Sequence, residues 1–558
     1  MTSSLVKRAL ALLLGAVAAA TAATAVTSAI TPRFFDDDPV WKDVDTQAAS
    51  GIKPLEVDLM VDLTYNLISS GERPSARAAN VNTIEEVPDS SWFTNRIGNP
   101  NRPQLTPEEI AIGPDTSAGP TAGRWKITSS KSDGVTPGFT IRDGNDQPWF
   151  LKFDPPGYRG MATGTEVVVT KLMWALGYNV PENHVAYVTR DQLVVGEGAR
   201  FTPPGGTRRL MRADDLDMLL RRANREKDGS FRVVASKPLP GKPIGRIRFF
   251  GTRPDDPNDI VPHEDRRELR GYGTFAAWLN HVDAKAINSL DTLVTVNGRD
   301  VVRHNLLDFG SALGSGGVAP ADYWAGSESL VEPGEVLKRA LTFGFRLPEW
   351  RREPFFESPS IGRLPRENRA FDPEAWKPRV PNRAFLQARA DDKFWAAQKL
   401  AAFDTDLLAA AVRTGDFRDP AAEAFLVKAL AERRDAIVRA YLGAINPVSE
   451  PTLDANGRLT FRNAAVDADI AHVPRAYRAR WSTFDNATGA TRMFGESTGP
   501  TNSLEAPAPL PATPGAFVMV EISGHGNTAA TWEQPIAAHF RRGAADWKLV
   551  GFNRLPDR

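Results

Sequence analysis

Hydrophobic and polar positions follow different spacings along this chain, and the changes of spacing divide it into regions. Between residues 124 and 195 apolar residues fall in short runs typical of β-strands, and strands are expected at 124–127, 138–142, 149–153, 185–188 and 193–195. One helix is expected among them at 163–176, because Gly177 follows its last apolar position and suits a helix C-terminus. The pattern therefore predicts three strands, a helix and two further strands.

From residue 263 onward, apolar positions recur every three or four residues, which is the spacing of amphipathic helices. We expect helices at 263–279, 394–413 and 420–442. The last has the clearest ends, because Asp419 can cap it and Pro420 suits its first helical position. A small strand-rich lobe is thus expected to precede a larger helical lobe.

The changes of pattern predict an α+β protein with six regions. These are a signal peptide or anchor at 1–29, an extended N-terminal arm at 30–123, a strand-rich lobe at 124–198, an insertion or hinge region at 199–262, a helical lobe at 263–446, and a linker with a small β-rich domain at 447–558. The arm contains an amphipathic stretch at 54–69 with a leucine at every fourth position. We expect it to wrap on the following domain and to bury Trp92 and Phe93.

The first thirty residues have the pattern of an export signal. Lys7 and Arg8 precede an uncharged apolar run at 9–29, and small residues before Val26 and Ile30 suit a signal peptidase. A retained anchor is the alternative, since these 21 uncharged residues can just span a bilayer. Both interpretations predict an exported protein of the periplasm, cell envelope or extracellular space, and the second adds membrane association through residues 9–29.

Composition excludes several classes of chemistry. The chain has no cysteine, which removes disulfides, cysteine nucleophiles and cysteine-ligated metal centres. Its 68 basic and 68 acidic residues cancel, so no overall field favours nucleic acid, and no nucleic-acid partner is expected. Specific binding must therefore come from local sites.

The most informative residues lie on either side of a predicted hairpin. Asp283, Lys285 and Asn288 come before it, and the tripeptide Asp308-Phe309-Gly310 comes after it. Each piece alone has an ordinary explanation, since an isolated Asp can end a helix and an isolated Asp-Phe-Gly can form a turn. The ordered set with this spacing is much less common than either piece.

This ordered set resembles the catalytic loop and the metal-binding Asp-Phe-Gly of protein kinases, in which the Asp and Asn of the loop are five positions apart, as Asp283 and Asn288 are. The resemblance covers residues 124–445. It implies that Asp283 accepts the proton of the attacking hydroxyl and that Lys285 neutralises charge on the transferred phosphoryl group. It also implies that Asn288 and Asp308 hold Mg²⁺ or Mn²⁺ beside ATP or another nucleoside triphosphate.

A second pair of residues lies upstream in the strand-rich lobe. Lys152 falls in the third strand and Glu166 in the helix that follows, which is the order of the strand lysine and helix glutamate that kinases use around the nucleotide phosphates. Two alternatives remain open. Residues 163–166 also spell a capping box, in which Glu166 would only satisfy the helix N-terminus. The strand pattern at Lys152 is likewise compatible with a side chain that faces solvent and not a cleft.

The phosphate-binding loop departs from the common kinase pattern. No GxGxxG is present, and the matching place at 129–138 offers Ser130, Gly134 and backbone N–H groups as nucleotide-binding candidates. An Ala-Pro-Glu motif is also missing. The chain is therefore more similar to the atypical branch, which includes HipA-like, CotH-like and phosphatidylinositol 3/4-kinase-like proteins.

Together with the N-terminal export pattern, the resemblance implies an exported phosphotransferase that acts on a hydroxyl of a protein, lipid or glycan. A nucleotide-binding pseudokinase, adenylyl transfer on the same fold and a structural cell-envelope protein are the alternatives. A zinc site at His263, His281 and His304 is less favoured, because no HExxH spacing exists.

Overall fold

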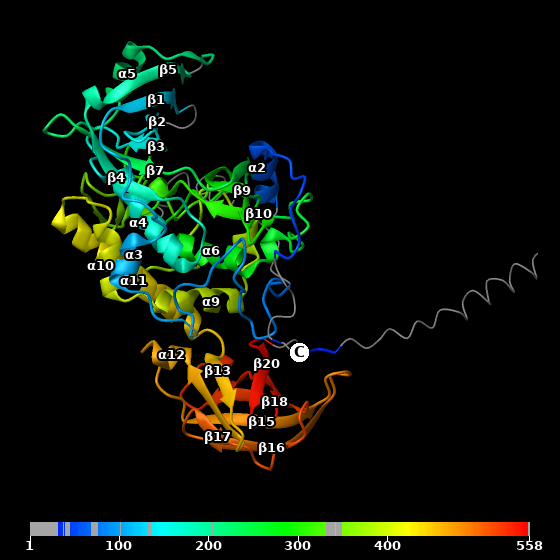
Figure 1. Ribbon diagram of the computed structural model, residues 1–558. Helices are drawn as coiled ribbons and strands as arrows, with labels where there is room; N and C mark the ends of the chain where they lie inside the picture. Colours follow the sequence, from blue (N-terminus) through cyan, green and yellow to red (C-terminus); the bar gives the residue numbers. More distant parts are fainter. Residues whose placement is uncertain are drawn as a thin grey trace, which may run out of the picture.

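The computed structural model shows a mixed α+β protein (Figure 1), which confirms the expected fold class. It describes residues 32–36, 38, 45–68, 76–100, 102–131, 136–203, 206–330, 341 and 349–555. The expected export segment at 1–29 and the candidate Gly134 lie outside these residues. Among the described helices, none is both long and apolar enough to cross a membrane.

A seven-stranded sheet forms the upper part of the molecule in Figure 1, with strand order β4-β7-β3-β2-β1-β5-β6. Its members are β1 Trp125–Ser130, β2 Gly138–Arg142, β3 Pro148–Phe153, β4 Asn183–Val188, β5 Leu193–Phe201, β6 Arg209–Leu210 and β7 Phe231–Ser236. Alternate residues of β1 to β3 are buried in a core of their own, which includes Trp125, Phe139 and Trp149. Helix α4, Met161–Leu176, follows β3 after a connection of seven residues and ends at Gly177.

The expected insertion at 199–262 is more closely integrated than its composition indicates. It supplies β7, which pairs with β3 on one side and β4 on the other, so the strand lies inside the sheet. It also supplies α5, Ala213–Leu220, and β8, Lys242–Gly245. The sheet thus has more strands than the five expected between 124 and 195.

The predicted hairpin forms from β9, Ser289–Val296, and β10, Arg299–Leu306, with β8 as the third strand of its sheet. Asn297 and Gly298 connect the strands with φ values of 51° and 75°. These positive values are those of the tight turn that Asn-Gly favours. The turn sets a register in which Ser289 lies opposite Leu306.

The middle of the molecule is helical. Its elements are η3 His263–Asp265, α6 Arg267–Trp278, η4 Ala286–Asn288, η5 Phe309–Ser311, η6 Glu349–Arg351, the short strands β11 Phe355–Phe356 and β12 Leu364–Pro365, α8 Arg383–Leu386, α9 Ala390–Ala401, α10 Thr405–Arg413 and α11 Pro420–Leu442. The single helix expected at 394–413 is wrong: Asp404 accepts a hydrogen bond from the backbone N–H of Leu407 at 2.8 Å and starts a new helix. Helix α11 has the predicted bounds.

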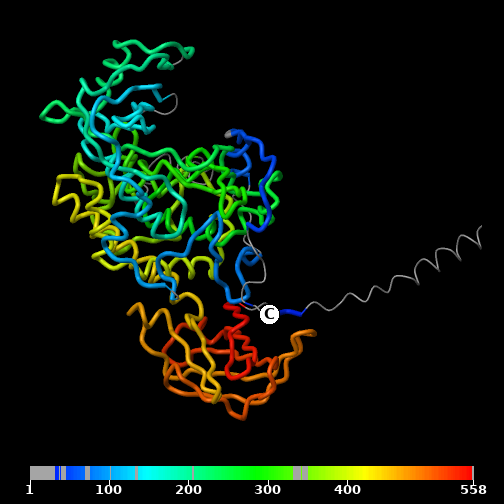
Figure 2. Tube along the Cα trace, viewed as in Figure 1, coloured from blue at the N-terminus to red at the C-terminus, as the bar shows by residue number. Residues whose placement is uncertain are grey.

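The N-terminal arm lies along both the helical part and the C-terminal strands, as the blue trace in Figure 2 shows. It contains α2, Leu59–Ile68, and α3, Pro107–Ile112. Trp92 and Phe93 are buried, as predicted, and the Phe93 ring packs edge-on against Tyr178. The arm therefore contributes to the core of the helical part.

The C-terminal region has two sheets and its own apolar core. Strands β13 Val448–Leu453, β14 Arg458–Asn463 and β17 Ser503–Glu505 form one sheet, and β15 Ala476–Phe484, β16 Thr491–Gly499, β18 Phe517–His525, β19 Ile536–Arg542 and β20 Trp547–Asn553 form the other. The short elements α12, Ala464–Asp467, and η7, Ala530–Glu533, lie beside them.

Candidate functional site

The β9–β10 hairpin brings together two segments that are twenty residues apart in sequence. Its open end joins the loop that carries Asp283 to Asn288 and the turn that carries Asp308. The backbone N–H of Leu307 donates to the carbonyl of Asn288 at 3.1 Å, which extends the ladder by one step. The candidates on both sides of the hairpin therefore lie at the same edge of the molecule's helical part.

Lys152 forms ion pairs with both candidate acids. Its Nζ lies 3.0 Å from Oε2 of Glu166 and 2.7 Å from Oδ1 of Asp308. The predicted pairing of Lys152 with Glu166 is confirmed. Glu166 is 2 % exposed, whereas the Asp308 side chain is 41 % exposed. One end of this three-residue group is thus sealed and the other faces water.

Glu166 also holds the turn that carries Asp308. Its two carboxylate oxygens accept hydrogen bonds from the backbone N–H groups of Phe309 and Gly310, each at 3.0 Å. A side chain at position 310 would bring its Cβ within 3.0 Å of the same carboxylate, so glycine suits this close approach. Glu166 therefore fixes Lys152 and the Asp-Phe-Gly turn at once.

The capping interpretation of Glu166 is wrong. Helix α4 begins at Met161, so Glu166 lies in its second turn, and Gly160 at the N-cap makes no side-chain cap. Asp154, just after β3, does the capping instead: its carboxylate accepts from the backbone N–H of Thr163 at 2.9 Å and from the Thr163 hydroxyl at 2.7 Å. The capping-box spelling could not reveal this, because the partner comes from outside the helix.

Asp308 is held in an uncommon backbone conformation with a φ of 63°. Such a left-handed residue is unusual outside glycine and often marks a functional turn, although Asp and Asn tolerate it best. The positive charge of Lys152 lowers the pKa of Asp308 against the effect of burial, and Lys131 contributes in the same direction. The side chain is therefore an ionised carboxylate at neutral pH.

The pKa of Lys152 is also shifted by its charged neighbours. Burial alone would lower its pKa, but the charges of Glu166 and Asp308 outweigh burial and raise the pKa. The lysine is therefore a fixed cation. A cation held between a sealed and an exposed carboxylate can contact an anionic ligand without losing its internal partner.

The candidate catalytic loop forms a compact hydrogen-bonded group. Nζ of Lys285 lies 2.7 Å from Oδ1 of Asp283. The amide Nδ2 of Asn288 donates to the backbone carbonyl of Asp283 at 2.8 Å and to its Oδ2 at 2.9 Å. Because Asn288 donates through Nδ2, its Oδ1 is the atom that remains as an acceptor or metal ligand.

His281 connects this loop to the Asp-Phe-Gly turn, a contact that the sequence interpretation missed. Its ring lies 5.5 Å from the Phe309 ring, and the side chain is 1 % exposed. Burial lowers its pKa to about 4, although Asp283 and Asp308 act in the opposite direction. The sequence did offer one signal for this contact, because His281 stands two residues before Asp283.

The remaining nucleotide-binding candidates are less clearly placed. Ser130 lies at the end of β1, and its buried hydroxyl accepts from the backbone N–H of Thr202 at 3.4 Å. This hydrogen bond links the end of β1 to the residue that follows β5. Gly134, as noted, is outside the described part of the chain.

No group of three or more His, Cys, Asp or Glu side chains suited to a metal occurs among the described residues. His263 is hydrogen-bonded to Asp259 and His304 to Asp291, each at a distance below 3 Å, so each of these histidines already has a buried carboxylate partner of its own. Asn288 and Asp308 offer two oxygen ligands, and a cation there would need further oxygens from a ligand or water.

Comparisons of the chain with protein-family models, with curated proteins and with solved structures find no match. The functional argument therefore depends on the geometry of the site.

Proposed function

We propose that this chain is an exported phosphotransferase with a two-lobed, atypical kinase-like domain. It would move a phosphoryl group from ATP or another nucleoside triphosphate to a hydroxyl of a protein, lipid or glycan. The observation that carries the proposal is the double ion pair of Lys152 with Glu166 and Asp308. Three residues from a strand, a helix and a turn meet there, and each has the sequence position that the kinase resemblance requires.

The arrangement of the chain supports two lobes. Lys152 belongs to the seven-stranded sheet, and the loop with Asp283 and the turn with Asp308 belong to the helical part. Phosphoryl transfer depends mainly on positioning and charge neutralisation, and these residues supply fixed charges of both signs. Mg²⁺ or Mn²⁺ would be held by Asn288 and Asp308 and would neutralise phosphate charge.

In the proposed reaction the acceptor hydroxyl loses its proton to Asp283 while its oxygen forms a bond to the terminal phosphorus. The bond from that phosphorus to the bridging oxygen breaks, and the nucleoside diphosphate leaves with the electron pair. Lys285, paired with Asp283 at 2.7 Å, would neutralise charge on the transferred group. Adenylyl transfer would use the same residues with attack at the α-phosphorus.

Binding and transfer can be tested separately. With Mg²⁺ and ATP at about 100 times the dissociation constant, the wild type should gain roughly 2.7 kcal/mol of stability, seen as a thermal shift. The Asp283→Ala variant should keep this shift but transfer no radiolabelled phosphate, because Asp283 acts on the acceptor. The Asp308→Asn variant should lose both.

The Asp469→Asn variant is the matched control, since Asp469 is exposed and also has a positive φ, of 54°. It should bind and transfer like the wild type. A shift in the wild type without transfer to any acceptor would favour the nucleotide-binding pseudokinase. No shift with ATP or GTP, with Mg²⁺ or Mn²⁺, would contradict nucleotide binding and favour the structural alternative.

A further inference from the structure

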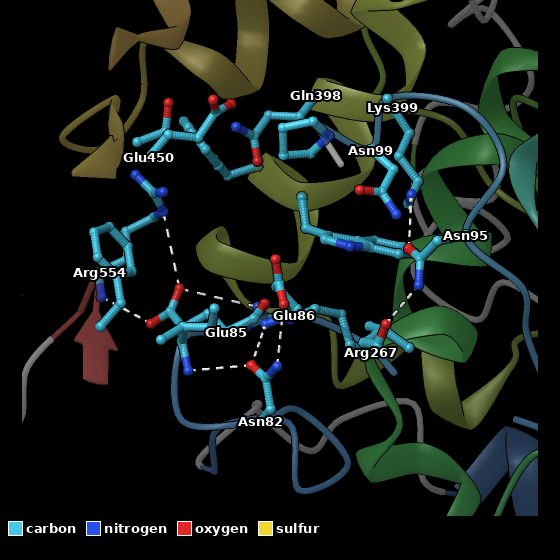
Figure 3. Close-up of a pocket in the computed structure, with 18 of the residues that line it drawn as sticks. Asn82, Glu85, Glu86, Asn95, Asn99, Arg267, Gln398, Lys399, Glu450 and Arg554 are labelled. Atoms are coloured by element: carbon cyan, nitrogen blue, oxygen red, sulfur yellow. Dashed lines mark hydrogen bonds and ion pairs between the residues drawn. The ribbon is translucent and has the colours of Figure 1, made fainter. Parts of the chain in front are cut away.

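A cavity of about 380 Å³ lies where the arm, helix α9 and the C-terminal strands β13 and β20 meet (Figure 3). Its volume falls in the range of small-molecule sites, which are mostly preformed and contain a few well-placed polar groups. It shares no lining residue with the candidate phosphotransfer site. The cavity therefore needs an explanation of its own.

One wall of the cavity is rigid. Arg267 lies 2.8 Å from the carboxylate of Asp391, and the backbone N–H of Arg554 donates to Glu85 at 2.8 Å. These residues belong to α6, α9, the segment after β20 and the arm, and all four are buried. The cavity is thus held open by bonds between elements that are far apart in sequence.

Lys399 brings an uncompensated charge to this cavity. Its side chain is 3 % exposed, and its Nζ donates to Oδ1 of Asn95 at 3.3 Å and to the carbonyl of Ile97 at 3.2 Å. Within the described parts of the chain no carboxylate forms an ion pair with it. Aromatic faces of Phe93 and Trp395 lie 5.4 Å and 5.3 Å from Nζ. A buried ammonium without a counterion is costly, so an anionic group on a ligand would be bound favourably.

Burial lowers the pKa of Lys399 to about 8, and Asp89 and Glu86 only partly oppose this effect. The lysine is therefore still mostly protonated at neutral pH, but its charged form is less stable than that of an exposed lysine. A bound anion would favour the protonated form and raise the pKa again.

Carboxylates lie in the rest of the cavity. Figure 3 shows Lys399 beside Asn95 and Asn99, with Glu450 on the opposite side. Glu450 is 41 % exposed, and its Arg462 partner is 3.7 Å away. Glu86 is exposed and accepts a hydrogen bond from Nδ2 of Asn82 at 3.2 Å. Both acids can attract a cationic group, and apolar surface of Phe394 and Pro451 also lines the cavity.

We propose that this cavity binds a zwitterionic ligand of the amino-acid or short-peptide class. The ligand's carboxylate pairs with Lys399 at one side, and its ammonium group pairs with Glu86 or Glu450. Its side chain packs on the apolar surface between them. This site is independent of the proposed phosphotransfer.

The test is calorimetry and thermal shift on the full chain with the free proteinogenic amino acids and a set of dipeptides. At least one should bind, and its C-terminal amide and its N-acetyl derivative should each bind at least tenfold more weakly. Failure of the whole set to bind would overturn the proposal. Equal binding of the C-terminally amidated ligand would also overturn it, since that result removes the role of Lys399.

The Lys399→Met variant should fold, because the loss of two hydrogen bonds, to Asn95 and to the carbonyl of Ile97, is offset by the removal of a buried charge that has no ion-pair partner. It should bind the selected ligand at least tenfold more weakly. Lys428→Met is the matched control, since Lys428 is 44 % exposed and lies outside the cavity. Undiminished binding by Lys399→Met would overturn the proposal, and the amide comparison on the wild type stands if that variant does not fold.

Discussion

Two groups of ion pairs in this molecule have similar internal geometry and different access to water. In one, Arg267 lies 2.8 Å from Asp391 and 3.1 Å from Asp392, and Arg270 lies 3.3 Å from Asp392; all four side chains are at most 2 % exposed. In the other, Lys152 joins Glu166 and Asp308, and its own side chain is 23 % exposed.

This difference in exposure to water indicates which of the two groups can bind a ligand. Arg267 also donates to the backbone carbonyl of Glu85 at 2.9 Å, so each of its three nitrogens has a partner and together they join α6, α9 and the arm. A buried charge satisfied in this way acts as a structural joint. Lys152 has one sealed partner and one exposed partner, so a ligand can reach it without dismantling the fold.

The largest expected effect on stability is at the sealed group. Arg267→Met leaves Asp391 and Asp392 buried with fewer partners, which should cost about 3–5 kcal/mol of unfolding free energy. Urea denaturation followed by circular dichroism measures the loss. Arg458→Met is the control, because Arg458 and its partner Glu505 are 58 % and 62 % exposed, and an exposed pair contributes about 0–1 kcal/mol. Equal midpoints for the two variants would contradict the comparison.

A smaller loss of stability is expected at the open group. Lys152→Met leaves Glu166 with its two backbone N–H partners, so the cost should be about 1–3 kcal/mol. Nucleotide binding, measured by thermal shift with Mg²⁺ and ATP, should nevertheless disappear. Lys126→Met, on an exposed position of β1, is the control and should retain it. Normal nucleotide binding by the Lys152→Met variant would show that Lys152 is not part of the nucleotide-binding site.

The pH dependence of stability should report His281. Its pKa in the folded chain is lowered from 6.5 to about 4, so between these values the unfolded chain binds more protons. Stability should therefore fall as the pH decreases from 6.5 to 4, by at most about 1.4 kcal/mol per pH unit from this group. The His281→Leu variant should show a shallower slope in urea titrations at several pH values.

His472→Asn provides the comparison for this measurement, because His472 is exposed. Its slope should match that of the wild type. Identical slopes for the wild type and His281→Leu would show that His281 does not dominate the loss of stability in this range.

The smallest expected change in stability is at Lys285. Its side chain is 35 % exposed and its partner Asp283 is 21 % exposed, so Lys285→Met should change the unfolding free energy by about 1 kcal/mol or less. Phosphate transfer should fall while the nucleotide-induced thermal shift persists. Transfer at the wild-type rate would show that Lys285 neutralises no charge in the reaction.

Local signals predicted the elements that they directly control. The Asp419 cap and Pro420 set the start of α11, and Asn297-Gly298 set the hairpin turn. The pairing of Lys152 with Glu166 was also predicted, since both lie on regular elements joined by a short connection.

The parts that were not predicted depend on contacts distant in sequence. Strand β7 enters the sheet between β3 and β4, which periodicity within the segment at 199–262 could not show. Asp154 caps the helix in place of the alternative capping box at 163–166, because the helix starts earlier than its apolar pattern. The cavity beside Lys399 requires the arm and the C-terminal strands together, so no single stretch of sequence carries its signal.

The path of the N-terminal arm sets the order in which parts of this protein can fold during its synthesis. The backbone N–H of Phe34 donates at 2.8 Å to Asn486, a residue 452 positions later, and Glu85 receives the backbone N–H of Arg554. At translation rates of about 5–20 residues per second, the arm waits roughly 20–90 s for these partners to be synthesised. During that interval Phe34 and Glu85 lack these partners, although the part of the arm around Phe93 can already pack on Tyr178. The newborn chain can therefore complete its fold only when its last strands have emerged.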